Sequence, residues 1–482
     1  MYTKKKLLTD DTDIENLIRT IAITTWKQRI NPKKSFNDLR SINETLTSLL
    51  NNHRTSNDFK KLINAFEGSN EFVIQAIVRE HKKYLNRYFD IPKDLYQRYV
   101  LSMDNMFIDW NNAKYKGNIR DYLTTLEDYI EILKEMSIFL GYKGHPYEAF
   151  LSEFIPEITL DEMEKIMDEL EFTALKQLNR NNNNNRCILY KKYSKEIQTK
   201  LMESVLQDLG FDFSKGLIVE SSHAFMMKLN SNDVRLAISA NEYNLADTLY
   251  STLHEFGHAI YEQNISYKEG ILSRGISHDF HEAQAKLFET FIGKKDGFIN
   301  YFSLKAKGFF PELKDDEIDK MFNEILKVNK SLVRTNADEA SFILHIIMRY
   351  RLEKGLIGGT LSVKDIDDYW QKMCYEYFGK LPSEFNESAY QDVHWGIGNF
   401  GHFPSYIIGL VYGAHIYKLL DNEIPLLENK ICEGKFKDIH HWLTKNIYSH
   451  GSIFTSSELF EKLSNEKPNT GPLLSYLKEL KN

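Results

Sequence analysis

The stretch Thr248-Leu-Tyr-Ser-Thr-Leu-His254-Glu255-Phe-Gly257-His258-Ala-Ile-Tyr261 predicts a helix with reactive side chains on one face. His254 and His258 are four residues apart, so both imidazoles project about one turn apart and can reach one metal ion. Glu255 follows directly, and its carboxylate can reach a water on that metal, which is the general-base position of a zinc hydrolase. Gly257 costs about 1 kcal/mol inside a helix, which indicates that something packs closely against it.

A metal site of this kind needs a third protein ligand, because zinc hydrolases use three and leave one position open for water. Candidates follow in Ser277-His278-Asp279-Phe280-His281-Glu282-Ala283-Gln284, ahead of a helical stretch at 286–292. A second helix beside the first could present a carboxylate, and Glu282 begins the helical periodicity. His278, His281 and Glu289 remain alternatives. Glu282 could equally be a helix N-terminal carboxylate favoured by the macrodipole.

Alternating apolar residues precede the metal helix between residues 216 and 240. The alternating positions are Phe225, Met227 and Leu229, then Val234, Leu236 and Ile238. Asn230-Ser231-Asn232-Asp233 lies between them and is typical of a turn, so the segment predicts a small antiparallel hairpin. Its edge could accept an extended peptide as an added strand. The alternative is a purely structural hairpin, braced by Asp233 and Arg235.

The remainder of the chain is patterned as amphipathic helices. Between about Asp10 and Glu171 the apolar residues recur at spacings of three and four, for example at Leu123, Leu126, Ile130, Leu133 and Met136. Helices should end or begin near Asn31-Pro32, Ile91-Pro92, Gly144-His145-Pro146 and Ile155-Pro156. The run Asn181 to Asn185 predicts an exposed loop. We therefore expect a mostly α fold with one small antiparallel β-sheet near the metal.

The composition is that of a globular chain. Its 482 residues are 42% hydrophobic and 27% charged, which is enough for an extensive core. A net charge of -7 argues against nucleic-acid binding, which normally requires a basic excess. No apolar run is long enough to span a membrane, and the first residues lack the apolar core of a signal peptide. The cysteines, Cys187, Cys374 and Cys432, form no CxxC pair, so we expect a cytoplasmic protein.

Beyond the metal motif, the chain resembles the carboxypeptidase Taq family of zinc metallocarboxypeptidases over nearly its whole length. In that family the histidine pair is followed by a His-Glu-Ser/Ala-Gln motif carrying the glutamate ligand, here His281-Glu282-Ala283-Gln284. The resemblance thus favours Glu282 over its alternatives. Further similar blocks are Val333-Arg334-Thr335-Asn336-Ala337-Asp338-Glu339, Leu344-His345 with Arg349, Gln391-Asp392-Val393-His394-Trp395, Gly401-His402-Phe403-Pro404-Ser405-Tyr406, and Trp442-Leu443, Asn446-Ile447 and His450-Gly451. Several blocks in the right order are more specific than the metal motif alone.

The resemblance implies a large helical body divided by a deep groove, with the metal at its floor, and a homodimer. It implies removal of single residues from peptide C-termini. His254, His258 and Glu282 would bind one Zn²⁺ per chain, although Co²⁺ or another divalent ion could occupy the same ligands. Residues 1–482 would form one catalytic domain, with a helical part to about residue 210 and a metal-bearing part from about residue 211.

Glu255, His394 and Tyr406 are the candidate catalytic residues. Glu255 would take a proton from the attacking water, whose pKa zinc lowers towards about 7, and pass it to the leaving amine. His394 and Tyr406 would donate hydrogen bonds to the oxyanion of the tetrahedral intermediate. Their structural alternatives are a histidine that caps a buried helix end and a tyrosine in the core.

Arg334 is the candidate for binding the terminal carboxylate of the substrate, because a guanidinium can hold it bidentately. Asp338 would orient Arg334, and the alternative is a weak surface ion pair between the two. Arg235 and Arg349 are rivals for the same role. His223, Arg235 and Gln391 are further substrate-binding candidates from the family-like blocks.

The chain departs from the family pattern at several groove positions. Ala224 replaces a proline, Ala237 a threonine, Ser388 a glycine and His402 a tyrosine, and Ile238-Ser239-Ala240 replaces Thr-Arg-Tyr. These differences leave two other functions open. One is an oligopeptidase or dipeptidyl carboxypeptidase of the same groove type, and the other is an inactive helical protein that binds peptides.

Overall fold

The computed structural model describes residues 2–30, 37–117, 119–180 and 191–480. These residues form two compact units, each assembled from separate stretches of the chain. Unit 1 contains Met1–Phe89, Cys187–Glu324 and Tyr412–Pro468, and unit 2 contains Asp90–Arg186, Ile325–Val411 and Asn469–Asn482. The run Asn181 to Asn185 and the break at Asn31-Pro32 lie outside the described residues.

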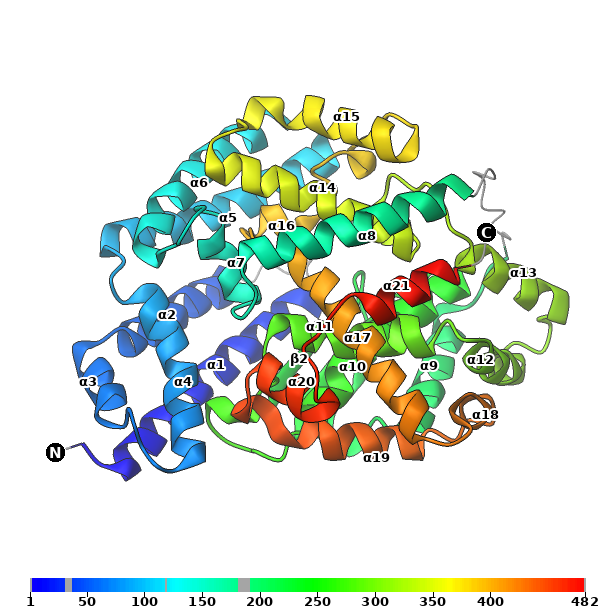
Figure 1. The fold of residues 1–482 in the computed structure, drawn as a ribbon, viewed down its shortest axis with the longest axis horizontal. Helices are drawn as coiled ribbons and strands as arrows, with labels where there is room; N and C mark the ends of the chain where they lie inside the picture. Colours follow the sequence, from blue (N-terminus) through cyan, green and yellow to red (C-terminus); the bar gives the residue numbers. More distant parts are fainter. Residues whose placement is uncertain (1, 31–36, 118, 181–190, 481–482) are drawn as a thin grey trace. The chain divides into compact units, whose positions relative to one another are not determined.

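Helices dominate the described residues of both units, which confirms the predicted mostly α fold (Figure 1). The helices of unit 1 are α1 (Lys4–Ile30), α2 (Asn37–Arg54), α3 (Asn57–Ala65), α4 (Phe72–Tyr88), α9 (Lys195–Leu209), α10 (Leu245–Gln263), α11 (His278–Lys286), α12 (Asp296–Phe309), α18 (Leu427–Cys432), α19 (Lys437–Asn446) and α20 (Ser456–Ser464). Those of unit 2 are α5 (Lys93–Lys116), α6 (Ile119–Leu140), α7 (Glu148–Phe154), α8 (Leu160–Arg180), α14 (Glu339–Gly358), α15 (Ile366–Phe378), α16 (Val393–Gly396) and α21 (Gly471–Lys478).

Two helices and several short turns complete the list. The bounds of α13 (Asp315–Leu326) and α17 (Pro404–Glu423) extend from one unit into the other. The 3-10 turns are η1 (Phe213–Lys215), η2 (Ile271–Ser273), η4 (Arg334–Asn336), η5 (Val363–Asp365), η6 (Phe385–Glu387) and η7 (Tyr448–Ile453), and η3 (Leu287–Ile292) is a π-helical turn that directly continues α11.

The predicted helix breaks near Pro92, Pro146 and Pro156 are confirmed. α4 ends at Tyr88 and α5 begins after Pro92, while α7 lies between the two later breaks. The periodic stretch at 123–136 lies in α6, whose apolar positions Leu126, Ile130, Leu133 and Met136 are buried. A proline lacks the backbone N–H and restricts its predecessor, so such positions end helices whatever packs around them.

The predicted hairpin is confirmed as β2 (Phe225–Asn230) and β3 (Asp233–Ile238), with Phe225 opposite Ala237 and Met227 opposite Arg235. A third strand, β1 (Ile218–Glu220), pairs with β3 in parallel, so the sheet is mixed with the order β1-β3-β2. The sequence did not reveal β1, because three residues are too few for an alternating pattern to appear.

The sheet packs between α1 and α10, both of which contact β2. Phe225, Met227, Leu229 and Ala237 face α1, where they pack around Trp26. Because successive strand residues point to opposite sides, Met226 and Lys228 face α10. The sheet thereby places backbone and side-chain groups of β2 beside the metal helix.

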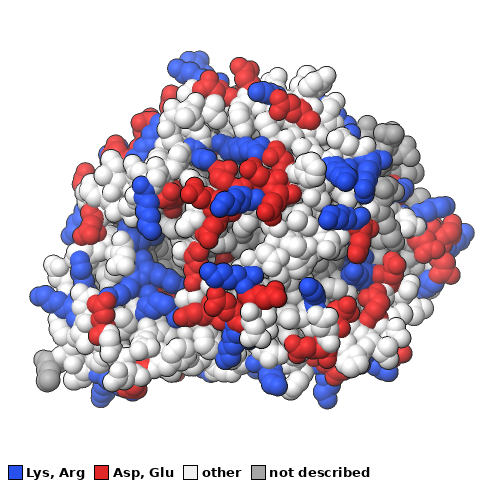
Figure 2. All heavy atoms as spheres, in the orientation of Figure 1, with Lys and Arg blue, Asp and Glu red and all other residues white. Residues whose placement is uncertain are grey.

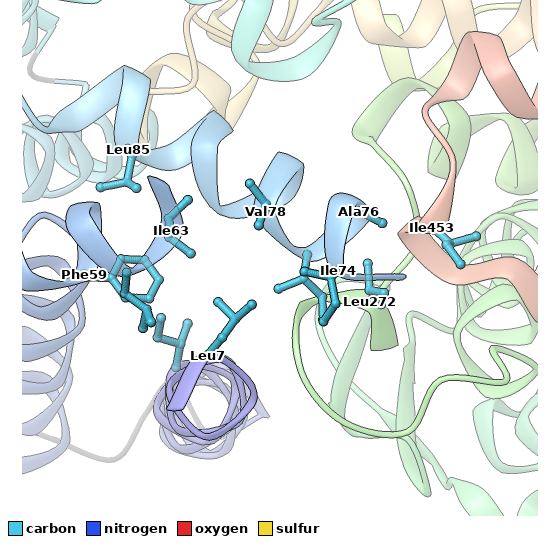
Figure 3. Packing of buried hydrophobic residues seen from close by; sticks show 12 residues of the cluster. Leu7, Phe59, Ile63, Ile74, Ala76, Val78, Leu85, Leu272 and Ile453 are labelled. Atoms are coloured by element: carbon cyan, nitrogen blue, oxygen red, sulfur yellow. The ribbon is translucent and has the colours of Figure 1, made fainter. Parts of the chain in front are cut away.

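A second cluster fixes the N-terminal helices of unit 1. Figure 3 shows Phe59, Ile63 and Leu85 near Leu7 of α1, and Ile74 of α4 near Leu272, with Ile453 at the other end of the cluster. The buried members are Leu7, Ile14, Phe59, Leu62, Ile63, Ile74, Ala76, Ile77, Val78, Leu85, Leu272 and Ile453. Asp11 supports the same region, because its buried carboxylate contacts His81 at 2.9 Å and accepts the N–H of Ile271 at 2.9 Å. These contacts hold the segment around Ile271 and Leu272 against the N-terminal helices. That segment leads into α11, which carries Glu282.

Charges are distributed rather than segregated on the visible surface. On the face drawn in Figure 2, Lys and Arg side chains interleave with Asp and Glu, and neither sign forms a continuous stripe among the described residues there. Each helix in the described part of the chain is too short or too polar to cross a membrane. The deep groove and the division near residue 210 stay predictions.

Candidate metal centre

Helix α10 carries the two predicted histidine ligands and the glutamate between them. It begins after Asn244, whose side chain accepts the N–H of Asp247, and its apolar residues are buried along nearly the whole length. His254 and His258 lie one turn apart, and their ring centroids are 4.9 Å from each other. The predicted helix and its shared imidazole face are both confirmed.

Gly257 allows α11 to approach this face closely. A Cβ atom at this position would lie 2.3 Å from the carbonyl oxygen of Gln284 and 2.6 Å from the Cα of Ala285. No side chain fits at such distances, so the glycine is required by direct backbone contact between the two helices. The close approach predicted from the sequence is confirmed, and it brings Glu282 of α11 opposite the imidazoles.

Glu282 completes a three-residue group with the histidines. Its Oε1 lies 3.8 Å from Nε2 of His254, and its Oε2 lies 3.7 Å from Nε2 of His258. Among the described residues, these three form the one cluster of His, Cys, Asp or Glu able to share a metal ion, with ligand atoms within 4.8 Å of one another. Ligands of a tetrahedral zinc ion are separated by roughly 3.3 Å, given bonds of about 2.0–2.1 Å, and the two distances from Glu282 to the imidazoles are close to that separation.

The chemistry of the group fits a divalent cation. Oε1 of Glu282 is buried and has no hydrogen-bond partner in the described part of the chain, which is costly unless a positive charge is bound. Two imidazole nitrogens with one carboxylate oxygen are a ligand set of catalytic zinc sites. The other candidates for third ligand do not join the group: His281 and Glu289 contact the far sides of the rings, and His278 begins α11.

Opposed electrostatic effects act on the two imidazoles. Burial lowers the pKa of His254, but the carboxylates of Glu282 and Glu289 outweigh it and raise the pKa to about 9. Burial and the neighbouring imidazoles of His281 and His254 hold the pKa of His258 well below its ordinary value. The pocket therefore favours a protonated His254 beside a neutral His258, and a bound divalent ion would displace the extra proton of His254.

Glu255 is buried next to the metal group but does not belong to it. Burial raises the pKa of its carboxyl group, and the charge of Glu282 acts in the same direction, whereas His254 and the backbone N–H of Met226 oppose the shift. The hydrogen bond from Met226 ties this carboxylate to strand β2. A carboxylate with a raised pKa accepts a proton more readily near neutral pH.

His394 and Tyr406, the other predicted catalytic residues, lie in unit 2 and contact each other. Nε2 of His394 is 3.0 Å from the hydroxyl of Tyr406. Burial lowers the pKa of His394 to about 3, so its ring is neutral, and its Nδ1 is buried without a hydrogen-bond partner among the described residues. The two residues form one hydrogen-bonded pair.

Arg334 is oriented by a different carboxylate from the one predicted. Its Nε and Nη2 donate to Oδ1 of Asp392 at 2.9 and 2.7 Å, and Arg349 donates to Oδ2 of the same residue at 2.8 Å. The expected partner Asp338 instead caps α14, where it accepts the N–H groups of Ala340 and Ser341. The pairing at four residues assumed a helix through Arg334, which lies in the 3-10 turn η4, so that expectation was wrong.

The remaining substrate-binding candidates differ in how many hydrogen bonds they form within the protein. Gln391 accepts the N–H of Arg334 at 2.7 Å and donates to the carbonyl of Leu332 at 3.0 Å, so its amide supports η4. Arg235 is held bidentately by Asp233 at 2.8 and 2.7 Å, which is the bracing arrangement considered from the sequence. His223 lies exposed between β1 and β2.

Sequence reasoning did not assign the residues that support the candidates. Glu262 contacts His281, Lys228 contacts Glu262, and Asp392 contacts Arg334. The available signal for Glu262 was its position on α10, four residues beyond His258 and so on the same face of the helix. Lys228 could not be found, because its role depends on how the hairpin packs on α10.

Comparison with known proteins agrees with this arrangement. Residues 6–480 match the family described as carboxypeptidase Taq (M32) metallopeptidase. Carboxypeptidase 1 of Bacillus subtilis is 31% identical, over 96% of this chain and 95% of that protein. Thermostable carboxypeptidase 1 of Thermus thermophilus is 28% identical, over 95% of this chain and 94% of that protein.

A solved structure agrees over the same length. The M32 carboxypeptidase from Deinococcus radiodurans superimposes with a TM-score of 0.91 at 26% identity, covering 98% of this chain and 97% of that one. The family match includes residues of both units, and it contains the histidine pair, Glu282 and the blocks around Arg334 and His394. The chain therefore belongs to the carboxypeptidase Taq (M32) family of metallopeptidases and is a metal-dependent carboxypeptidase.

Proposed function

We propose that the protein uses zinc and releases one residue at a time from the C-termini of peptides. The observation that carries this proposal is the convergence of His254, His258 and Glu282, with the buried carboxylate of Glu255 beside them. Two imidazoles and a carboxylate favour zinc over the hard cations, which prefer oxygen ligands alone.

The metal would supply Lewis acidity, which polarises the scissile carbonyl and lowers the pKa of the attacking water. Glu255 accepts the proton of that water on its carboxylate and then donates it to the leaving amine nitrogen. The N–H of Met226 holds the carboxylate during both transfers. Burial of Glu255 keeps the proton affinity of the carboxylate high enough to serve as base and then as acid.

His394 and Tyr406 are proposed to stabilise the oxyanion. The neutral His394 donates from Nε2 to the oxygen of Tyr406, which leaves the hydroxyl proton of Tyr406 to donate to the substrate. Arg334 is proposed to bind the terminal carboxylate of the peptide, with Asp392 fixing the plane of its guanidinium. For Gln391 and Arg235 a supporting role fits their contacts better than direct binding, and the exposed His223 stays a candidate for binding the peptide.

The first test combines zinc content with product analysis. We expect the purified full-length chain loaded with Zn²⁺ to release single C-terminal residues from an unblocked peptide library, measured by mass spectrometry, and to stop when a chelator removes the metal. Release of dipeptides would favour the dipeptidyl alternative. Bound zinc without any hydrolysis would favour the inactive peptide-binding protein.

The second test is Glu255→Gln, which removes the base but leaves the three ligands. We expect kcat to fall by roughly 10²–10⁴-fold, because that is the usual contribution of a positioned general base. Zinc content should stay at the wild-type level. Glu269→Gln is the matched control, since Glu269 is an exposed carboxylate between α10 and α11. Unchanged turnover in Glu255→Gln would refute the assigned role.

Three broader expectations belong to the same proposal. We propose a homodimer, which light scattering on the purified chain can test. We propose that residues 1–482 act as one catalytic domain, and the family match over residues 6–480 supports this. We propose a cytoplasmic location, supported by the free thiols of Cys374 and Cys432.

A further inference from the structure

The two imidazoles of the metal centre are held from behind by different groups. Nδ1 of His254 is 2.8 Å from Oε2 of Glu289, whereas Nδ1 of His258 is 2.6 Å from Nδ1 of His281. In both rings it is Nε2 that faces Glu282. A partner at Nδ1 thus decides which nitrogen is left for the metal.

His281 is itself held by a carboxylate, and this fixes its tautomer. Its Nε2 lies 3.0 Å from Oε1 of Glu262, which can only accept, so Nε2 carries the proton. Nδ1 of His281 is then an acceptor, and the N–H at Nδ1 of His258 donates a hydrogen bond to it. The outcome is an unprotonated Nε2 on His258, directed at Glu282.

Each of the two outer carboxylates is paired with a lysine. Glu262 contacts His281 and pairs with Lys228, and Glu289 contacts His254 and pairs with Lys286. Lys228 of β2 lies 2.8 Å from Oε2 of Glu262 and also contacts the carbonyl of Ser273. Lys286 of α11 lies 2.7 Å from Oε2 of Glu289. Glu262 and Lys286 are buried, so each charge requires its partner. These pairs orient the imidazoles without adding net negative charge around the metal.

Glu282 and Glu289 follow each other along one continuous helical segment, and both face His254 of α10. Glu282 lies 3.8 Å from Nε2 of His254, and Glu289 lies 2.8 Å from its Nδ1. Glu289 lies in the π-helical turn η3 that continues α11. Such turns shift side-chain direction within a helix and occur often at functional sites.

We propose that His281 and Glu289 are positioning residues that hold Nε2 of His258 and His254 towards the metal, and that Glu262 acts through His281. This inference rests on the proposed zinc site. The competing explanation is structural: the buried ion pairs would join α10 to β2 and α11 without any effect on the metal.

The test measures the dissociation constant for Zn²⁺ by chelator competition on the full chain, for Glu289→Gln, His281→Phe and Glu262→Gln. We expect the dissociation constant to rise 10–100-fold in each variant, because the loss of a residue that hydrogen-bonds to a metal ligand usually weakens metal binding by about that factor. The visible spectrum of the Co²⁺ form should also change, because the imidazoles can tilt. Glu269→Gln is the control and should bind like the wild type.

A double variant separates positioning from general weakening of the fold. If Glu262 acts through His281, then His281→Phe combined with Glu262→Gln should bind zinc no more weakly than His281→Phe alone. The thermal midpoint of the metal-free proteins is measured in parallel. If His281→Phe does not fold, Glu289→Gln and Glu262→Gln carry the test, because each removes the charge of the outer partner and keeps the size of its side chain.

The outcomes are distinct. Dissociation constants for zinc within twofold of the wild type in folded variants would overturn the proposal. Additive effects of His281→Phe and Glu262→Gln would overturn the claim that Glu262 acts through His281. A lower metal-free midpoint with unchanged zinc affinity would establish the structural explanation. A wild-type chain that binds no zinc would overturn the proposed function as well, and this is seen before any variant is made.

Discussion

Glu353 of α14 is a buried carboxyl group that forms hydrogen bonds with the segment around His394. Its Oε1 accepts from Nε1 of Trp395 at 2.7 Å, and its Oε2 accepts from the hydroxyl of Tyr147 at 2.8 Å and from the N–H of Gly401 at 2.9 Å. Burial raises the pKa of Glu353 to about 7, although these three donors oppose the shift. One residue thus connects a helix, a tryptophan and a loop within unit 2.

This shift predicts a pH dependence of stability. The folded pKa of Glu353 exceeds its ordinary value of 4.5, so between these two values the folded chain binds more protons than the unfolded chain. The contribution is therefore fully present below about pH 4.5 and is lost as pH rises towards 7, by on the order of 2–3 kcal/mol. Glu353→Gln cannot titrate and should lack this slope. Urea unfolding at pH 5 and pH 8 measures it, and equal slopes in the two proteins would contradict the assignment.

At the scale of elements, the contact between α10 and α11 decides the geometry of the metal centre. Gly257 permits the backbones to touch, Glu282 comes from one helix, and the histidines come from the other. Strand β2 adds the N–H of Met226 and the side chain of Lys228 to the same place. The small sheet is therefore part of the site and not only a brace.

Substitution of Gly257 by alanine tests this contact. The added Cβ would overlap the backbone of α11, so we expect a loss of stability of about 1–3 kcal/mol or more and weaker zinc binding, because Glu282 moves away. Gly308→Ala is the control. Gly308 lies in α12 with nothing within 4 Å of its Cβ position, so alanine there should stabilise by about 0.5–1 kcal/mol. Thermal unfolding and chelator competition measure both, and wild-type zinc affinity in Gly257→Ala would contradict the contact.

At the scale of the whole molecule, the metal ligands all belong to unit 1. We expect removal of zinc by a chelator to increase amide hydrogen exchange in α10 and α11, while peptides from α5, α6 and α8 of unit 2 keep their exchange rates. The reason is that bound zinc stabilises only the folded state that binds it, by about 4 kcal/mol when the free zinc concentration is a thousand times Kd.

Glu255→Gln provides the control for this experiment, since its ligands are intact and its exchange should respond to the chelator as in the wild type. Equal deprotection of both units would contradict the assignment of the metal to unit 1.

The sequence by itself determined the helical fold class, the hairpin, the histidine pair and the need for close packing at Gly257. These features follow from local spacing, because periods of 3.6 and 2 residues and the preferences of proline and glycine act within a few positions. The family resemblance then singled out Glu282, which spacing alone had left beside His278, His281 and Glu289.

Only the tertiary structure decided which groups support the reactive ones. Asp392 orients Arg334 from 58 positions away, where the nearby Asp338 had been expected, and Lys228 reaches Glu262 across 34 positions. Such pairs leave no periodic trace in the sequence, since they form only when separate elements pack and bury charges that then require partners. Local patterns therefore identified the two histidine ligands, whereas packing between elements decided which groups hold the ligands in place.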